Sequence, residues 1–404
     1  MSDVPTVGLA DIEAAREVLA GVAINTPMEE SRWLSAHAGG PVSLKCENLQ
    51  RTGSFKARGA YLRISRLSAE ERAHGVVAAS AGNHAQGVAL AAQLLGIKAT
   101  VFMPEGAPIP KEKATRGYGA DVSFHGRYLE DAMVEARAFA ERTGAVLIHP
   151  FDHVDIVAGQ GTAGLEILEQ APDVQTVLVP TGGGGLLAGI AIAVKAIRPD
   201  VRVVGVQAAG AAAYPGSLAA GAPVALESMT TMADGIAVGR PGDITFAAVR
   251  DHVDDIVTVS EDSLARAVLA ILERAKMLVE PAGAAAVAAI LDEPRAFGTP
   301  VVAVLSGGNI DPLLLGKVIR HGMAAAGRYL NLQVCIPDLP GGLAQLLVDI
   351  SAVGANVLEV VHERISPSLH LNEVEVHLQL ETRGEPHTEQ LLTRLRERGY
   401  RVYE

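Results

Sequence analysis

Hydrophobic and polar positions follow one repeating pattern over most of this 404-residue chain. From about residue 42 to residue 325, short runs of mainly β-branched residues are each followed by a glycine-containing turn and a longer amphipathic stretch. The runs that predict strands are 42–45, 76–79, 99–102, 145–148, 176–179, 202–206 and 301–305. Repeated βα units form parallel sheets with helices on both faces. The pattern therefore predicts an α/β domain whose ligands bind at the carboxyl ends of the strands.

The pattern changes near residue 326. Residues 329–336 and 374–380 alternate strictly between apolar and polar side chains, as half-exposed antiparallel strands do. The remaining elements expected after this point are helices at 341–353 and 388–399 and strands at 355–363 and 400–404. Their order is βαββαβ, which predicts a ferredoxin-like α+β domain at 326–404 after a first domain at 1–325.

Composition narrows the class of protein. With 49% apolar and 20% charged residues, the chain has the make-up of a well-cored globular protein. The net charge of -12 and the absence of a dense Lys and Arg cluster argue against a nucleic-acid partner. Cys46 and Cys335 are too few and too far apart to indicate a disulfide framework or a zinc site. No run approaches the ~20 apolar residues of a membrane span and the start lacks a signal-peptide pattern, so we expect a cytoplasmic protein with no membrane partner.

The loop "TGGGGLLAG" joins a predicted strand to a predicted helix at Thr181 to Gly189. Consecutive glycines let the backbone approach an anion, and the start of a helix offers free N–H groups and the positive end of its dipole, so the loop suits a phosphate. A dinucleotide is disfavoured because Gln207 stands about where an acidic ribose ligand would be expected. A glycine turn required only for tight strand–helix packing is the alternative.

Three other loops at strand ends carry polar groups among small residues: "SFK" ending at Lys56, "SAGNHAQG" at Ser80 to Gly87, and "SGGN" at Ser306 to Asn309. A nucleophilic lysine needs a partly desolvated amine, and a Schiff base with a carbonyl cofactor is its commonest use. Lys56 alone would be interpreted as a solvent-exposed helix lysine. A lysine of this kind together with a phosphate loop suggests pyridoxal phosphate.

Taken in order, the segments "SFKARGA", "SAGNHAQG", "TGGGGLLAG", "EPAGAAAVAA" and "SGGN" resemble the fold-type II pyridoxal-phosphate enzymes, and most of all the threonine dehydratase (threonine ammonia-lyase) family. The resemblance covers about residues 5–325. It implies a two-lobed catalytic domain like the tryptophan synthase β chain, with a smaller lobe at roughly 47–152 inserted in the larger one. The last domain, with "PDLPGGLAQLL" and "GANVLEVVHER", resembles an ACT-type regulatory domain.

The resemblance also implies roles for individual residues. Lys56 forms the Schiff base with pyridoxal 5'-phosphate and, once displaced by substrate, removes the Cα proton. Phe55 packs against the cofactor ring, Asn83 bonds its 3-hydroxyl, and Ser306 meets the pyridine nitrogen. A neutral hydroxyl at that nitrogen favours loss of a β-hydroxyl over transamination.

Two groups of residues share a task under the same resemblance. The residues expected to bind the cofactor phosphate are Gly182, Gly183, Gly184, Gly185 and Leu186. The residues expected to hold the substrate carboxylate are Ser80, Ala81, Gly82, Asn83 and His84. His84 taken alone is more simply explained as a polar loop or core residue.

The implied reaction converts L-threonine to 2-oxobutanoate and ammonia, with L-serine as a slower substrate. Serine racemases of the same superfamily have a second serine as a base in the asparagine loop, and Ala81 stands at that position here. Cysteine synthase-like β-replacement and an amino-acid-binding protein without catalysis are the other hypotheses. Asp234 is a candidate cation ligand, but an Asp before Gly is commonly a turn residue, so no metal is assigned.

The last domain predicts an amino-acid effector, such as isoleucine or valine, at an interface between two ACT-type domains. The candidate contacts are Gly341, Gly342 and Asn356, and the alternative is that these glycines only turn a strand into a helix. Paired domains imply a homodimer or homotetramer. The sequence does not distinguish threonine from serine or a bulkier β-hydroxy amino acid as the preferred substrate, nor a biosynthetic from a catabolic role.

Overall fold

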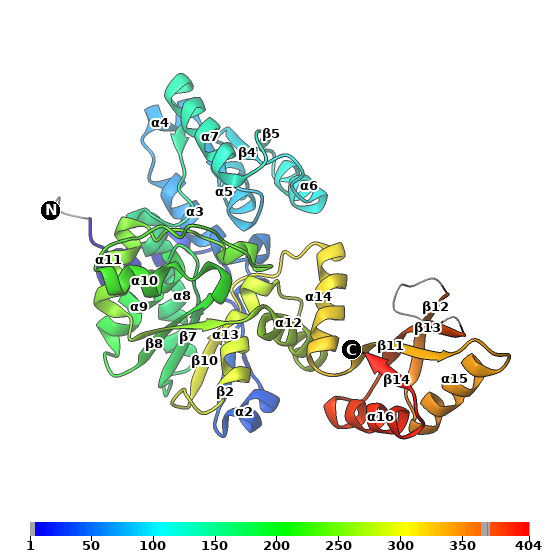
Figure 1. The fold of residues 1–404 in the computed structure, drawn as a ribbon. Coiled ribbons are helices and arrows are strands. Elements are labelled where there is room, and N and C mark those ends of the chain that lie inside the picture. The colour runs from blue at the N-terminus through cyan, green and yellow to red at the C-terminus, as the bar shows by residue number, and fades with distance from the viewer. Residues whose placement is uncertain (1–4, 365–369, 371, 404) are drawn as a thin grey trace. The chain divides into compact units, whose positions relative to one another are not determined.

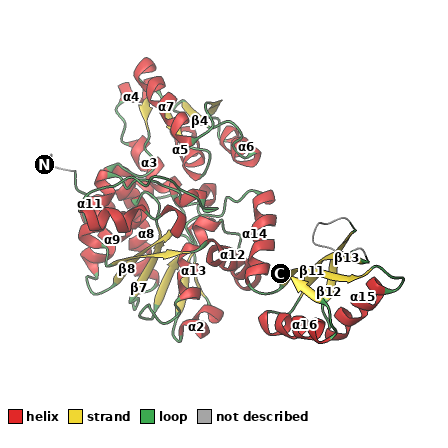
Figure 2. Ribbon diagram, in the orientation of Figure 1, coloured by secondary structure: helices red, strands yellow, loops and turns green. Residues whose placement is uncertain are grey.

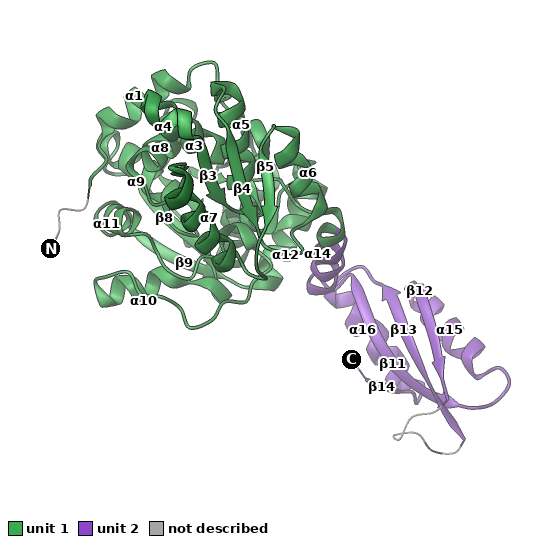
Figure 3. Cartoon of the chain, turned by 90° about the horizontal axis from the view of Figure 1, so that it is seen from above, with its two compact units in different colours: residues 1–315 green, residues 316–404 purple. Residues whose placement is uncertain are grey.

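The computed structural model describes residues 5–364, 370 and 372–403. The chain forms two compact units, residues 1–315 and residues 316–404 (Figure 3). The division expected from the sequence, after residue 325, falls at the end of helix α14 (Pro312–Ala325), whereas the compact units divide inside this helix. Because the helix continues through the junction, its apolar pattern gives no sign of where one unit ends.

The large lobe of the first unit is built on a six-stranded sheet with the order β1-β2-β10-β7-β8-β9. Only β1 runs antiparallel to its neighbour. The strands are β1 (Met28–Glu30), β2 (Val42–Lys45), β7 (Thr176–Pro180), β8 (Arg202–Ala208), β9 (Asp255–Val259) and β10 (Val301–Val304). Strands β7 and β10 are buried along their whole length, which is why their sequences are almost purely apolar. The predicted α/β class is confirmed.

Helices cover both faces of this sheet (Figures 1 and 2). They are α1 (Leu9–Leu19), α2 (Arg32–Ala38), α8 (Val154–Gln170), α9 (Gly185–Ile197), α10 (Ala213–Ala220), α11 (Asp243–His252), α12 (Glu261–Ala270) and α13 (Pro281–Asp292). The expectation of amphipathic helices is wrong for α9, which is buried on every side from residue 185 to residue 194 because α8 and α11 pack against it as well as the sheet. No helix in the described part of the chain is long and apolar enough to cross a bilayer.

The small lobe, residues 56–147, is inserted between β2 and β7 and has its own parallel sheet with the order β5-β4-β3-β6. Its strands are β3 (Val76–Ala79), β4 (Ala99–Met103), β5 (Asp121–Phe124) and β6 (Val146–Leu147). Its helices are α3 (Lys56–Ser65), α4 (Ala69–His74), α5 (Asn83–Leu95), α6 (Ile109–Gly117) and α7 (Leu129–Thr143). The range of about 47–152 predicted for this lobe from the sequence extends beyond these elements at both ends.

The second unit has the predicted βαββαβ order and an antiparallel sheet with the strand order β12-β13-β11-β14. Its elements are β11 (Tyr329–Pro337), α15 (Gly342–Val353), β12 (Asn356–Glu363), β13 (Glu373–Glu381), α16 (Glu385–Glu397) and β14 (Arg401–Tyr403). Alternate residues of β13 are buried, as the strict alternation in the sequence predicts. The ferredoxin-like prediction is confirmed.

A buried ionic cluster fixes helix α3 to the large lobe. The Arg58 guanidinium lies 2.8 Å from the Glu47 carboxylate and 2.7 Å from that of Glu166. Lys45 in β2 lies 2.6 Å from the second oxygen of Glu166. Two cations thus face two carboxylates, all of them buried. Because Arg58 is in the first turn of α3, the cluster sets the position of Lys56 at the start of that helix.

We predict that Arg58→Met lowers the free energy of unfolding by about 3–5 kcal/mol, because it leaves the Glu47 and Glu166 carboxylates buried without an arginine. Urea or thermal unfolding of the two proteins measures the difference. Arg16→Met is the matched control, since Arg16 pairs with Glu169 at an exposed site where an ion pair contributes little. An equally small effect of both substitutions would contradict this account of the cluster.

Candidate active site

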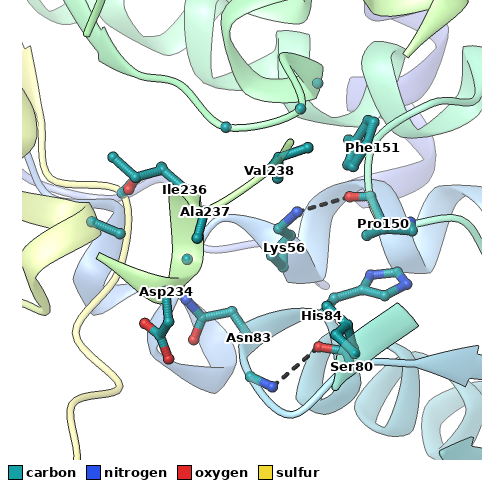
Figure 4. Close-up of a pocket in the computed structure, with 18 of the residues that line it drawn as sticks. Lys56, Ser80, Asn83, His84, Pro150, Phe151, Asp234, Ile236, Ala237 and Val238 are labelled. Atoms are coloured by element: carbon teal, nitrogen blue, oxygen red, sulfur yellow. Dashed lines mark hydrogen bonds between the residues drawn. The ribbon is translucent and has the colours of Figure 1, made fainter. Parts of the chain in front are cut away.

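A pocket with a volume of about 410 Å³ opens where the small and large lobes of the first unit meet. It is bounded by the first residues of α3, α5 and α9, which follow strands of both sheets (Figure 4). Every residue that the sequence analysis assigned to the cofactor or the substrate lines it: Phe55, Lys56, Ser80, Ala81, Gly82, Asn83, His84, Gly182, Gly183, Gly184, Gly185, Leu186 and Ser306. Segments far apart in the sequence are thus brought to one site.

Lys56 is the first residue of α3 and points into this pocket (Figure 4). Its Nζ donates a hydrogen bond of 2.8 Å to the Pro150 carbonyl and lies 5.2 Å from the centre of the Phe55 ring. Desolvation lowers the pKa of Lys56 to about 8, with the Glu280 carboxylate acting in the opposite direction. A useful fraction of the amine is therefore uncharged, and nucleophilic, near neutral pH.

The loop before α3 is tied to the loop after β10. Phe55 N donates to the Ser306 carbonyl at 3.3 Å, and Gly308 N donates to the Gly53 carbonyl at 2.9 Å. Gly53 has a φ of 71°, a conformation for which glycine has no steric cost. These bonds place Ser306, which is 4% exposed, beside the first turn of the lysine helix.

Asn83, the first residue of α5, is held by two side chains that the sequence analysis did not assign to the site. Its Nδ2 donates to Glu280 Oε1 at 2.6 Å, and its Oδ1 accepts from Asn309 Nδ2 at 2.8 Å. Burial, and secondarily the charge of Asp234, raise the pKa of Glu280 to about 7. The sequence offers one signal for Glu280: an acidic residue directly before the small apolar run "PAGAAAVAA".

All five residues of the loop expected to hold the substrate carboxylate line the pocket, but the Ser80 N–H donates to the Phe102 carbonyl at 3.0 Å. Ser80 Oγ accepts a hydrogen bond of 3.1 Å from Gly82 N (Figure 4). His84 differs from the expectation, because its Nε2 donates to the Ile148 carbonyl at 2.8 Å. Burial, with Lys56 as the next cause, lowers the pKa of His84 to about 3, so the ring is neutral. This ring nitrogen is therefore not available to a carboxylate.

An ion pair spans the pocket between the lobes. Lys111 Nζ in α6 lies 2.7 Å from Asp234 Oδ2 in the short helix η4 (Asp234–Ile236). Asp234, a candidate cation ligand in the sequence, thus has a lysine partner. Among the residues that the structure describes, no group of three or more His, Cys, Asp or Glu side chains is placed to hold a metal ion. No sequence signal indicated Lys111, since its partner lies in a distant segment.

The glycine loop leaves no space for side chains. Gly184 has a φ of 94°, and a Cβ there would lie 1.9 Å from the Tyr214 hydroxyl. A Cβ on Gly183 would lie 2.4 Å from the Phe151 ring. Helix α9 begins at Gly185, so its first N–H groups have no acceptor within the helix and line the pocket. The loop is therefore consistent with both interpretations of its glycines, tight strand–helix packing and a binding site for a phosphate.

Pyridoxal phosphate fits this set of groups. The side-chain-free start of α9 suits a phosphate ester, and the partly uncharged Lys56 amine suits an aldehyde. Asn83 supplies an amide donor and Ser306 a neutral hydroxyl on the same pocket wall. The pocket volume also lies within the range of about 300–1,000 Å³ that small-molecule sites commonly have.

The residues expected to bind an effector lie in the second unit and are not all brought together. Gly341 precedes α15 with a φ of 93° and lines a pocket of about 610 Å³ with Leu339 and Arg364. Gly342 begins α15, and a Cβ there would lie 2.9 Å from the Pro337 carbonyl. Asn356 Nδ2 donates to the Glu381 carboxylate at 3.3 Å and does not line that pocket.

Comparison with known proteins gives a consistent result. Residues 19–307 match the family described as pyridoxal-phosphate dependent enzyme. The L-threonine ammonia-lyase of Thermotoga maritima is 46% identical over 396 residues, which cover 98% of this chain and 99% of that relative. The structure of the T.th. threonine deaminase is 45% identical, with a TM-score of 0.72 over 75% of this chain and 99% of that one. Maize serine racemase is 37% identical, with a TM-score of 0.74 over 78% of this chain and 97% of that one. The chain belongs to the family of pyridoxal-phosphate dependent enzymes.

Proposed function

We propose that the protein is an L-threonine ammonia-lyase, which converts L-threonine to 2-oxobutanoate and ammonia and acts more slowly on L-serine. The observation that carries the proposal is a pocket that joins a partly desolvated lysine to a glycine phosphate cradle, with Ala81 at the position in the asparagine loop where serine racemases have a second serine. The nearly full-length relative from Thermotoga maritima has the same activity in its name.

In this proposal, bound pyridoxal phosphate supplies an electron-withdrawing ring that stabilises negative charge at the substrate Cα. Gly182 to Leu186 hold its phosphate, Phe55 packs on its ring, and Asn83 donates to its 3-oxygen. Ser306 faces the ring nitrogen with a neutral hydroxyl, which does not hold that nitrogen protonated. Negative charge at Cα is then less delocalised, and prompt loss of a β-substituent is favoured.

Lys56 is the base of the proposed reaction. Its Nζ accepts the Cα proton while the substrate carboxylate is held by the loop from Ser80 to His84. The N–H groups of Ala81, Asn83 and His84 serve this purpose, since that of Ser80 donates to the Phe102 carbonyl and that of Gly82 to Ser80 Oγ. The electron pair left at Cα forms the Cα–Cβ double bond, and the Cβ–O bond breaks. The hydroxyl takes up a proton and leaves as water. After release, the enamine product is hydrolysed by water to 2-oxobutanoate and ammonia.

Elimination is preferred to racemisation because racemisation needs a second base on the opposite face of the substrate. Ala81 has only a methyl group at the position of the racemases' second serine, and burial lowers the pKa of His84 to about 3, so its ring is a poor base. The likeness to maize serine racemase does not separate the two reactions, since threonine deaminases share the same fold. The distinction rests on Ala81.

We predict that Lys56→Ala removes the visible absorption of the protein-bound cofactor. We also expect it to lower 2-oxobutanoate formation from L-threonine by about 10²-fold or more, the range of a positioned proton-transfer group. Three assays separate the possible reactions. Ketoacid formation from a panel of β-hydroxy amino acids reports elimination, chiral analysis for D-serine reports racemisation, and a thioether assay reports β-replacement. Lys98→Ala is the matched control, because Lys98 forms an exposed ion pair with Asp121 in the small lobe. Retained turnover in Lys56→Ala would refute the assignment.

A second prediction concerns the glycine cradle. In Gly183→Ala the new methyl group would overlap the Phe151 ring, so we expect the dissociation constant of pyridoxal phosphate to rise roughly tenfold or more, as overpacking costs about 1–3 kcal/mol. Titration of the apoprotein measures this constant. Gly216→Ala in α10 is the control, since in the described part of the chain no atom beyond its neighbours and its own helix backbone lies within 4 Å of a Cβ at that position. Equal affinities in the two variants would count against the phosphate site.

We further propose that the second unit is an ACT-type regulatory domain that binds an amino acid such as isoleucine or valine where two copies pair, which requires at least a homodimer. Its ferredoxin-like order and the tight turn at Gly341 support this. Regulation requires that the effector bind two states of the enzyme with different affinities.

The corresponding prediction is that isoleucine or valine changes the activity with L-threonine. In Gly341→Asn we expect the effector concentration for a half-maximal response to rise about tenfold, while the activity without effector is unchanged. Asn is among the side chains that tolerate positive φ best, so the change adds volume with less strain than most other residues would. Gly399→Asn is the control, because Gly399 also has a positive φ, 86°, but lies outside the 610 Å³ pocket. Identical activity with and without each branched-chain amino acid would exclude this regulation.

A further inference from the structure

The orientation of the Asn83 amide is set by a chain of hydrogen bonds. Asn309 Nδ2 donates to the Thr52 carbonyl at 2.5 Å and to Asn83 Oδ1 at 2.8 Å. Asn83 Nδ2 then donates to Glu280 Oε1 at 2.6 Å. Because the Thr52 carbonyl can only accept, it fixes which way Asn309 points, and Asn309 fixes Asn83 in turn. The nitrogen of Asn83 therefore faces Glu280.

Glu280 is enclosed at the other end of this chain. Its side chain is 3% exposed, and its backbone N–H donates to the Gly307 carbonyl at 3.1 Å. A Cβ placed on Gly307 would lie 2.6 Å from Glu280 Oε1, and one on Gly235 would lie 3.3 Å from it. Because Gly307 and Gly235 have no side chains, the Glu280 carboxyl group has room beside Asn83.

The charges facing Glu280 come from three elements. Asp234 in η4 disfavours the ionised carboxylate, whereas Lys111 in α6 and Lys56 in α3 favour it. Burial is the largest cause, and the pKa of Glu280 is about 7 as a result. In this structure, Glu280 is thus divided between its neutral and its charged form near neutral pH, and a further negative charge close by would shift it to the neutral form.

Asn83 Nδ2 carries two hydrogens, and Glu280 takes only one of them. In the proposed function, on which this step rests, the other is donated to the 3-oxygen of the cofactor. Two acceptors on one amide nitrogen lie about 5 Å from each other, because each sits about 2.9 Å away at an angle of roughly 120°. A negatively charged 3-oxygen at that separation disfavours an ionised Glu280.

We propose that Glu280 is a positioning residue, which holds the Asn83 amide toward the 3-oxygen of the cofactor and takes up one proton from solvent when that oxygen binds. The proton goes to a carboxyl oxygen of Glu280, and no other bond changes. The neutral acid keeps one carbonyl oxygen, so it still accepts from Asn83 Nδ2. Uptake of the proton removes the repulsion between the two acceptors without releasing the amide.

The experiment counts protons by calorimetry. Pyridoxal phosphate is titrated into the apoprotein at pH 8 in two buffers of different ionisation enthalpy, for the wild type and for Glu280→Gln, a neutral side chain of the same shape. A group of pKa about 7 is about 90% ionised at pH 8. We therefore expect the wild type to take up nearly one proton more than the variant. We also expect the cofactor dissociation constant of Glu280→Gln at pH 8 to be no higher than that of the wild type. Glu280→Ala removes the acceptor of Asn83 Nδ2, so we expect pyridoxal phosphate to bind about tenfold more weakly to this variant.

Asp292→Asn is the matched control, because it removes a carboxylate from the last position of α13, the helix that Glu280 precedes, and Asp292 does not line the pocket. It should leave the proton count unchanged. Equal counts in the wild type and Glu280→Gln would overturn the inference.

A second measurement does not depend on the variants folding. The infrared spectrum of the wild-type holoprotein, compared with that of the apoprotein, should gain the carbonyl band of a protonated carboxylic acid, shifted in D₂O; its absence would also overturn the inference. A protein that binds no pyridoxal phosphate would refute the proposed function instead. A protein that binds it and forms 2-oxobutanoate with equal proton counts would leave the function standing and refute only the role of Glu280.

Discussion

The catalytic unit depends on keeping the amine of Lys56 largely out of water without giving it a carboxylate in contact. Its hydrogen-bond partner is a backbone carbonyl, which holds the amine in place but does not hold it charged. The ionic pairing that α3 needs to stay in the core is placed instead at Arg58, whose charge is matched by Glu47 and Glu166. The first turn of one helix thus carries both a paired cation, Arg58, and a partly desolvated amine, Lys56.

The remaining groups of the site follow from where parallel strands end. Loops after strands of both lobes open helices at the same pocket, so side chains and free N–H groups from distant segments meet there. Hydrogen bonds between the loop before α3 and the loop after β10 then fix Ser306 and Asn309 against the lysine helix. The pair formed by Lys111 and Asp234 joins the lobes at the same place.

The sequence predicted the buried parts of this fold well and the edges less well. Strand β3 has the expected limits because a central parallel strand is a continuous apolar run, and β2 has them although Ser43 and Lys45 interrupt its apolar residues. The edge strand β5 was missed because only one of its residues is buried, and β9 for a similar reason. The residues predicted to bind the cofactor could be assigned a role because their motifs are local. Glu280, Asn309 and Lys111 were assigned none, because each makes its contacts only with a partner brought close by folding.

The glycine cradle has a consequence for how this protein can change. Its donors belong to the backbone from Gly182 to Leu186, and none of the four glycines has a side chain that could be lost. Substitution of these glycines can only add atoms, as at Gly183 or Gly184, and cannot remove them. An alanine scan of the predicted phosphate site therefore measures the cost of added volume at its glycines rather than the loss of a side chain.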